Sequence, residues 1–479
     1  MQTRPSRSGP LTSPLAPCLV AGLGLLSACG HTESTVATAA DGGGLLVTGG
    51  TILTLDARDT VLEDGAVAIE RGRIVAVGPA EELAAAYPEH RRIDATGKIV
   101  LPGLINAHTH APMVLFRGLA DDLELMDWLE NHIFPAEAKH VDEAFVRAGT
   151  RLACLEMLAG GTTTFVDMYY YEDAIAEEAE RCGMRAVVGE TLIDFPAPDH
   201  ATWDEAAAYT RSFVTRWKDH PRITAAVAPH SAYTVSGEHL RAAHALAEEL
   251  DAPLLTHLAE APGEIEQVRE RTGTTSILFM DSIGVLGDRM LAAHVVWPGP
   301  EEIELLADRG VGVAHCPQSN MKVAAGIAPV PALLAAGVAV GLGTDGAASN
   351  NDLDLWEEID TAAKLHKVAA LDPTLIDARQ ALRLATIEGA RALDLEEEIG
   401  SLEAGKRADL IVVGTDGYHQ RPYSNPYSLL VYSTKAADVE TVVVEGRVVV
   451  ENGRVLTLDA EAVLAEAEAW RKRISGPAQ

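Results

Sequence analysis

Two patterns of hydrophobic and polar positions divide the chain, and the first of them occupies both ends. Short runs with strand character are separated there by turn residues. Residues 45–48, 51–55, 65–69 and 73–77 form the N-terminal set, and residues 408–413, 439–450 and 454–456 form the C-terminal set. The predicted turns are Gly49-Gly50, Glu70-Arg71-Gly72, Glu445-Gly446 and Asn452-Gly453. Neither end is large enough to be stable alone, so we predict that both pair into one small β-sandwich.

The middle of the chain alternates apolar strands with amphipathic helices such as Glu143–Leu158 and His239–Leu250. The predicted strands are Ile99–His110, Thr163–Met168, Arg185–Thr191, Ile223–His230, Leu254–Leu258, Met290–Val296, Gly312–Cys316 and Val338–Asp345. Eight strands, each followed by a helix, over ~300 residues predict an α/β fold, a (β/α)8 TIM barrel. A last helix is predicted over Ala460–Ile474, with its acidic residues early and its basic residues late.

The first residues have the features of an export signal. Arg4 and Arg7 are the only charges before Glu33, and the apolar run 15–26 is shorter than the ~20 residues that a membrane span needs. Leu26-Ser27-Ala28-Cys29 resembles a bacterial lipobox, which implies lipidation of Cys29. We therefore expect an exported protein, lipid-anchored to a bacterial membrane and facing the periplasm or the outside. The alternatives are an ordinary signal peptide, or a cytoplasmic protein if the true start codon lies elsewhere.

These patterns give a predicted division of the chain. The segments are a signal peptide (1–28), a flexible tether (29–44), the β-sandwich (45–100 and 403–457), the barrel (101–402) and a C-terminal helix (458–479).

Composition excludes several classes of protein. A hydrophobic fraction of 47% is that of a globular chain, and five cysteines in 479 residues cannot form a disulfide scaffold. Loss of Arg4 and Arg7 with the signal changes the formal charge of −32 to −34. Such a charge argues against nucleic acid or an anionic membrane surface as a partner. Cys154, Cys182 and Cys316 lie in apolar surroundings, and we expect them to be buried and inert.

Ionisable residues recur where the predicted barrel strands end, which is where barrel enzymes carry their chemistry. They are His108, His110, His230, His257, Glu260, His294 and Asp345. Taken singly, His230 or His294 would be interpreted as a core histidine, Asp345 as a turn residue and Glu260 as a helix-start acid. Their shared placement at five strand ends instead indicates one site. His315 on the seventh strand has no role that the sequence assigns.

Longer motifs accompany these residues. They are Leu101-Pro102-Gly103-Leu104-Ile105-Asn106-Ala107-His108-Thr109-His110, Gly160-Gly161-Thr162-Thr163-Thr164, Ser319-Asn320-Met321-Lys322, the run 343–351 and the run 400–410. From about Leu45 to Asn452 the chain resembles the amidohydrolase superfamily. Within it, the chain is similar to the 5-methylthioadenosine/S-adenosylhomocysteine deaminases and the related triazine chlorohydrolases.

The resemblance implies a metal centre and roles for its neighbours. Its ligands would be His108, His110, His257 and Asp345, a set that suits Zn²⁺ and would also suit Fe²⁺. The fourth strand lacks the lysine of two-metal members, so one divalent metal is expected. The water-activating pair would be Asp345 and His294, the acid for the ring nitrogen Glu260, and the substrate contacts Glu137 (with ribose hydroxyls) and His230. Without the resemblance, Glu137 would be interpreted as a solvated helix-start acid, and Trp128 is expected either in the cavity wall or in the core.

The expected activity is hydrolytic deamination of a purine-type nucleoside or a related heterocycle, with release of ammonia. The alternatives are a triazine-type chlorohydrolase or aminohydrolase with the same site, and an inactive lipid-anchored binding protein. The partner is a small heterocyclic molecule, the membrane enters only through the anchor, and a homo-oligomer is compatible with the sequence. Acidic residues crowd the stretch after the first barrel strand and should disfavour anionic substrates: Asp121, Asp122, Glu124, Asp127 and Glu130.

Overall fold

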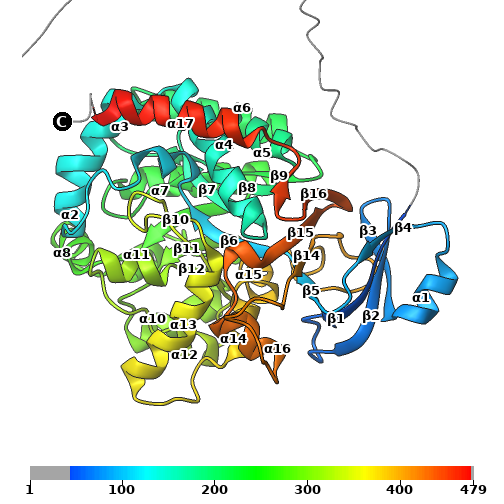
Figure 1. The fold of residues 1–479 in the computed structure, drawn as a ribbon. Helices are drawn as coiled ribbons and strands as arrows, with labels where there is room; N and C mark the ends of the chain where they lie inside the picture. The colour runs from blue at the N-terminus through cyan, green and yellow to red at the C-terminus, as the bar shows by residue number, and fades with distance from the viewer. Residues whose placement is uncertain (1–43, 476–479) are drawn as a thin grey trace, which may run out of the picture. The chain divides into compact units, whose positions relative to one another are not determined.

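The computed structural model describes residues 44–475, and Figure 1 shows their helices and strands. The predicted signal peptide 1–28, the lipidation site Cys29 and all of the tether except Gly44 lie outside the described residues.

Eight parallel strands form the barrel that the sequence predicts. They are hydrogen-bonded in chain order: β6 (Leu104–Thr109), β7 (Thr162–Tyr169), β8 (Arg185–Leu192), β9 (Ile223–Pro229), β10 (Leu254–Leu258), β11 (Met290–His294), β12 (Gly312–His315) and β13 (Val340–Leu342). The first and last strands come together where Asp345 N donates to His108 O at 2.9 Å. Glycine makes this approach possible, because a Cβ at Gly343 would lie 2.8 Å from His108 N.

Helices follow the strands and cover the barrel (Figure 1). After β6 come η1 (Ala111–Phe116), α2 (Leu125–Trp128), η2 (Leu129–Ile133), α3 (Phe134–His140) and α4 (Glu143–Ala159). The next are α5 (Glu172–Cys182), α6 (Trp203–Trp217), α7 (Gly237–Leu250), α8 (Pro262–Thr272), α9 (Ser276–Ser282), α10 (Pro300–Arg309), α11 (Pro317–Lys322) and α12 (Val330–Ala335). The series ends with α13 (Leu355–Ala370), α14 (Ala378–Leu384) and α15 (Ile387–Ala392).

Strands from both ends of the chain pair in one mixed sheet, which confirms the predicted association. Its strands are β1 (Leu45–Leu53), β2 (Val61–Glu70), β3 (Arg73–Pro79), β4 (Arg91–Asp94), β5 (Ile99–Pro102), β14 (Leu410–Val413), β15 (Val439–Val444), β16 (Arg447–Glu451) and β17 (Arg454–Val455). The hydrogen-bonded order is β17-β16-β15-β14-β5-β1-β2-β3, with β4 paired to β1. Two helices and a short turn of helix complete this part of the chain: α1 (Ala80–Ala86), α16 (Pro426–Tyr432) and η3 (Ala436–Asp438).

The prediction of a single strand from Ile99 to His110 is wrong. The chain breaks at Gly103, so that β5 belongs to the mixed sheet and β6 to the barrel. A Cβ at Gly103 would lie 2.2 Å from the side chain of Thr163, and only glycine fits at this crossing. Gly103 N donates to Asp409 O and Leu104 N to Gly161 O, so the two neighbouring residues already bond to different partners.

The predicted turns have a mixed outcome. Gly49-Gly50 is not a turn but an irregularity inside β1, where the register against β2 shifts. The hairpin turn Glu445-Gly446 is confirmed, because both residues have positive φ (48° and 73°) between β15 and β16. Arg71-Gly72 and Asn452-Gly453 turn in the same way.

The C-terminal helix is confirmed as α17 (Ala460–Ser475). It lies against α4, where the buried Trp470 ring meets Phe145 edge-on and Arg151 Nη2 is 2.8 Å from Glu466 Oε2. The three cysteines in the described residues are buried and free, as the sequence predicts.

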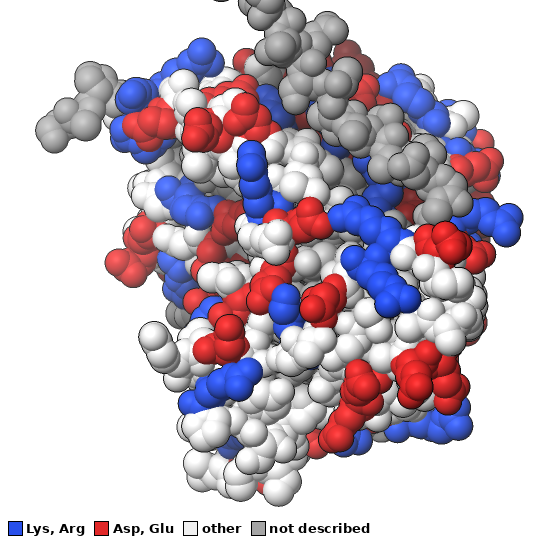
Figure 2. Space-filling model, turned by 45° about the vertical axis from the view of Figure 1, so that its right-hand side comes forward, with Lys and Arg blue, Asp and Glu red and all other residues white. Residues whose placement is uncertain are grey.

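Charge is spread over the surface. On the face shown in Figure 2, acidic and basic side chains are interspersed. Ion pairs such as Arg407–Glu445 (2.6 Å) join acids and bases in the described residues. Within residues 44–475, no helix has both the length and the apolar character needed to cross a membrane.

Candidate active site

The predicted site residues come together at the carboxyl ends of the barrel strands. Seven of them line one cavity: His110, Glu137, His230, His257, Glu260, His294 and Asp345. His108 lies beside them at the end of β6. Its Nε2 is 3.6 Å from Asp345 Oδ1. These residues come from elements up to about 240 positions apart in sequence. The barrel topology brings them together, because the carboxyl ends of its strands meet on one side.

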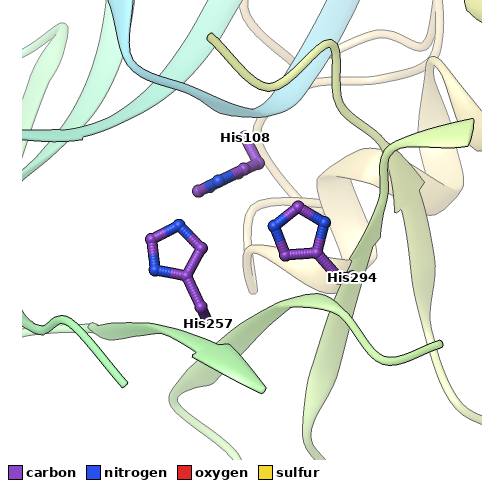
Figure 3. Close-up of side chains that lie close together, drawn as sticks. All are labelled: His108, His257 and His294. Carbon is purple, nitrogen blue, oxygen red and sulfur yellow. The ribbon is translucent and has the colours of Figure 1, made fainter. Parts of the chain in front are cut away.

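Four potential metal ligands face one another. His110 Nε2 lies 3.4 Å from Asp345 Oδ1 and 3.3 Å from His257 Nε2. Figure 3 shows the rings of His108, His257 and His294 turned toward a common point from three strands. His108 Nε2 is buried and has no hydrogen-bond partner among the described residues. A buried nitrogen without a hydrogen-bond partner, close to other potential ligand atoms, is what a bound metal ion would satisfy.

Hydrogen bonds at Nδ1 orient the histidines. His110 Nδ1 donates to Met168 O at 2.5 Å, and His257 Nδ1 donates to His230 O at 2.9 Å. A carbonyl oxygen only accepts, so the hydrogen is on Nδ1 and the Nε2 lone pair faces the site. Burial lowers the pKa of both imidazoles and keeps them neutral.

Asp345 is held as an anion. Burial acts to raise the pKa of its carboxyl, but His294, His110, His108 and the hydroxyl of Ser319 outweigh burial and hold that pKa below its usual value. Ser319 Oγ donates to Asp345 Oδ2 at 2.7 Å, and Gly346 N donates to Oδ1 at 2.7 Å.

The surroundings of Glu260 favour its protonated form. Its side chain is buried after β10, and burial, Asp345 and Glu264 together raise its pKa well above the usual value. His294 Nε2 lies 3.8 Å from Glu260 Oε2. The other ring nitrogen, His294 Nδ1, donates to Asn320 Oδ1 at 2.9 Å, which leaves Nε2 free to accept a proton.

The opposite wall of the cavity carries Glu137 and aromatic residues. Glu137 is on α3, and burial raises its pKa to about 7, although the Tyr169 hydroxyl acts in the opposite direction. Trp128 lines the cavity, which is one of the two positions expected for it from the sequence. His230 Nδ1 lies 2.9 Å from Thr234 Oγ1, and burial lowers the His230 pKa to about 3.

Several residues that support the active site were given no role in the sequence analysis. Ser319 and Asn320 stand in a motif that the sequence singled out, but without a role. Glu264 accepts from the backbone N–H groups of Ala259 (3.0 Å) and Glu260 (2.6 Å). Asp167 Oδ1 accepts from the N–H that follows His110 at 2.5 Å. His315, which received no role, is buried with its Nε2 3.2 Å from His366 Nε2 and does not line the cavity.

The chain is similar to known proteins in sequence. Residues 99–449 match the sequence model of the amidohydrolase family, and residues 65–89 match an imidazolonepropionase-like composite domain of bacteria. A 5-methylthioadenosine/S-adenosylhomocysteine deaminase of Syntrophobacter fumaroxidans is 52% identical over 420 residues, covering 88% of this chain and 96% of that protein.

Solved structures agree with the sequence matches. An adenosine deaminase of Xanthomonas campestris with bound zinc has a TM-score of 0.89 and 40% identity, covering 90% of this chain and 99% of that one. The atrazine chlorohydrolase of Arthrobacter aurescens in complex with zinc has a TM-score of 0.82 and 29% identity, covering 89% and 100%.

Proposed function

Because the chain belongs to the amidohydrolase family, we propose that it is a metal-dependent hydrolytic deaminase of neutral purine nucleosides such as 5-methylthioadenosine. The observation that carries this proposal is the presence of Asp345, His294 and Glu260 in one cavity, where the pKa of Asp345 is lowered and that of Glu260 is raised. His294 Nε2 lies 3.8 Å from Glu260 Oε2. Hydrolysis of a cyclic amidine needs both a base and an acid within reach of one carbon.

His108, His110, His257 and Asp345 would hold the metal. Three neutral imidazoles and one carboxylate suit Zn²⁺, the ion in both related structures. A divalent metal in such a site supplies hydroxide near neutral pH by lowering the pKa of water from ~16 to ~7. No lysine stands on β9 (Ile223–Pro229), which favours one metal over two.

The remaining residues move protons. Asp345 and His294 take the proton of the attacking water, while Glu260 gives its proton to the ring nitrogen that gains electron density. As the new C–O bond forms, the first proton of water passes through Asp345 and His294 to the leaving amine, and the exocyclic C–N bond breaks. The second proton, on the new hydroxyl group, passes to Glu260 as the carbonyl forms, which restores the acid. Water and the amidine thereby become a carbonyl compound and ammonia, with charge and hydrogen balanced.

The substrate end of the cavity favours a neutral riboside. An ionised Glu137 can accept hydrogen bonds from two vicinal ribose hydroxyls. The cavity residues among those described include no Lys or Arg, whereas Glu137, Glu260 and Asp345 are acidic. A phosphate or free carboxylate on the substrate would therefore have no cationic partner there.

Ammonia release by the zinc-loaded protein tests the proposal. With 5-methylthioadenosine or adenosine we expect turnover, and Glu260→Gln should lower kcat by about 10²–10⁴-fold at unchanged zinc content. Glu266→Gln is the matched control, because Glu266 is an exposed acid on α8. No ammonia from any purine, pterin or guanine substrate would refute deamination.

A triazine-type hydrolase is the second candidate, supported by the likeness to atrazine chlorohydrolase at 29% identity. The buried Glu137 favours the nucleoside. If Glu137→Ala impairs only ribosides, the nucleoside assignment holds. If the wild-type protein releases chloride from atrazine and the variant does so equally well, the triazine assignment replaces it. An inactive binding protein would be indicated by failure to hold about one equivalent of zinc at this site.

We also propose that the mature protein is exported and lipid-anchored at Cys29. The support is the motif Leu26-Ser27-Ala28-Cys29 behind a basic and then apolar segment. In a bacterial host, the wild-type chain should fractionate with membranes and carry lipid at Cys29 by mass spectrometry. Cys29→Ser should abolish the lipid. A soluble, unprocessed wild-type chain would contradict the proposal.

A further inference from the structure

A second group of buried ionisable side chains lies outside the active site, around the connection between β7 and α5. Three of its carboxylates hold the backbone of this connection. Tyr169 N donates to Glu172 Oε1 (2.8 Å), Tyr171 N donates to Asp199 Oδ2 (2.8 Å) and Glu172 N donates to Glu190 Oε2 (3.2 Å). These bonds account for one oxygen of each carboxylate.

The other oxygens have no partner. Glu172 Oε2, Glu190 Oε1 and Asp199 Oδ1 are buried without a hydrogen bond among the described residues. No Lys or Arg within residues 44–475 forms an ion pair with these three acids. Burial raises the pKa of Glu172 and Glu190 well above the usual value, and the neighbouring carboxyl groups of Asp167 and Asp199 raise them further. Either protons or a cation must neutralise the group.

His200 gives part of the group the chemistry of a metal site. Its Nε2 is buried without a partner, 3.8 Å from Glu190 Oε1 and 3.9 Å from Asp199 Oδ2. The three ligand atoms lie within 4.8 Å of one another. In the active site, His110 Nε2 lies 3.3 Å from His257 Nε2 and His108 Nε2 lies 3.6 Å from Asp345 Oδ1, so the distances of 3.8 and 3.9 Å from His200 Nε2 need only a small contraction to match.

Burial favours a site that is closed on most sides. The Glu190 side chain is 0% exposed and that of Asp199 is 3% exposed, whereas His200 is 17% exposed and leaves an edge open to solvent. His200 is therefore the member of the group nearest to solvent, while the two carboxylates are shielded from water.

We propose that Glu190, Asp199 and His200 form a second binding site for a divalent transition metal, with Zn²⁺ as the fitting ion. One imidazole and two carboxylates are ligands that Zn²⁺ accepts, and water can supply the fourth. This ion is structural. It offsets the buried negative charge and fixes the backbone that carries Tyr169 and Tyr170, two residues of the cavity wall.

Metal counting on the full chain tests the site independently of deamination. After chelation, reloading with Zn²⁺ and desalting, we expect two equivalents of zinc in the wild type. His257→Asn and His200→Asn should each leave one equivalent. His239→Asn should leave two, because His239 forms an exposed pair with Asp194 (2.6 Å) in the same region. One equivalent in the wild type, lost in His257→Asn and kept in His200→Asn, would overturn the site in favour of a shared proton.

Diffraction keeps the test decisive if His200→Asn does not fold. Wild-type crystals soaked in Zn²⁺ should show an anomalous peak between Glu190, Asp199 and His200 in addition to the active-site peak. Added Zn²⁺ should also raise the Tm of His257→Asn, and Glu190→Gln in that background should abolish the rise. A peak at the active site alone, or a Tm rise that survives Glu190→Gln, would overturn the proposal.

Discussion

Three histidines of the active site are oriented through the same ring atom. Nδ1 of His110, His257 and His294 each lies within hydrogen-bond distance of an oxygen atom, and two of these acceptors are backbone carbonyls. Only His294 depends on a side chain, the amide of Asn320. Its tautomer is therefore the one that a single substitution can disturb without moving the backbone.

Replacing Asn320 by alanine should impair catalysis and spare the metal. Without the Oδ1 acceptor, His294 is free to place its hydrogen on Nε2, where it can no longer accept a proton. We expect kcat to fall by about 10–100-fold with unchanged zinc content. Asn320→Asp, which keeps an acceptor, should retain more activity. Gln318→Ala on the same helix is the control, and an equal loss there would attribute the effect to α11 as a whole.

We predict that ionisation of Glu137 lowers the stability of the folded protein and favours substrate binding. Its folded pKa of about 7 lies above the usual 4.5, so the folded state holds this proton more tightly than the unfolded state. Stability from this group is thus full at low pH and is lost as the pH rises from 4.5 through about 7. Glu137→Gln should raise the Tm at pH 8 relative to wild type and have little effect at pH 4.

The same ionisation should control riboside binding. Because the role proposed for the Glu137 carboxylate is to accept hydrogen bonds from both ribose hydroxyls, KM for 5-methylthioadenosine should fall as the pH rises through about 7, by about tenfold per unit on the acid side. In Glu137→Gln this slope should vanish, while Glu130→Gln, an exposed acid nearby, should keep it. A pH-independent wild-type KM would contradict the assigned role.

At the scale of elements, the periodicity of apolar residues predicted the barrel, but not the point where the chain passes from the mixed sheet into the barrel. The run Ile99–Ile105 is apolar throughout because β5 and β6 are both buried, so its hydrophobic pattern does not mark the break. The break depends on Thr163, a residue sixty positions away that meets Gly103 in space. Contacts of this kind have no local signal.

The candidate site divides in the same way. Histidines and acids at strand ends were predictable because barrel geometry fixes where strand ends meet. Glu264 and Asp167 were not, since each acts by accepting backbone N–H groups, Glu264 from the loop just before α8 and Asp167 from the distant segment that follows β6. An isolated acid in a helical or apolar stretch has the same sequence appearance whether it holds a loop or faces solvent.

A Cβ at Gly103 should destabilise the fold through Thr163. Gly103→Ala brings a methyl group into a buried β-branched side chain that cannot rotate away, and overpacking of this kind costs about 1–3 kcal/mol. Urea unfolding should show a lower midpoint in Gly103→Ala and a partial recovery in the double variant with Thr163→Ala. Additive losses in the double variant would show that the two positions are not in contact.

At the scale of the whole molecule, the charge of −32 reflects an excess of acidic residues, and some of those near the cavity are engaged in local contacts. In the acidic stretch after β6, Asp121 lies 2.6 Å from Lys322, and the Glu124 carboxylate caps α2 by accepting from Met126 N and Asp127 N. Asp122 and Asp127 are exposed. The field that an approaching substrate meets therefore comes from these exposed acids together with the acidic cavity wall.

Substrate charge should consequently decide the rate of capture. Adenosine 5′-monophosphate adds a charge of about −1.5 to −2 near pH 7 to a nucleoside that is otherwise the same. We expect kcat/KM for adenosine to exceed that for the monophosphate by at least about tenfold at low salt, and the gap to narrow as salt screens the exposed acids. At low salt, the double variant Asp122→Asn/Asp127→Asn should show a smaller difference in kcat/KM between the two substrates than the wild type. The difference in kcat/KM that remains at high salt measures the contribution of the cavity, whose lining residues include no Lys or Arg to pair with the phosphate. A monophosphate used as well as its nucleoside would contradict both contributions.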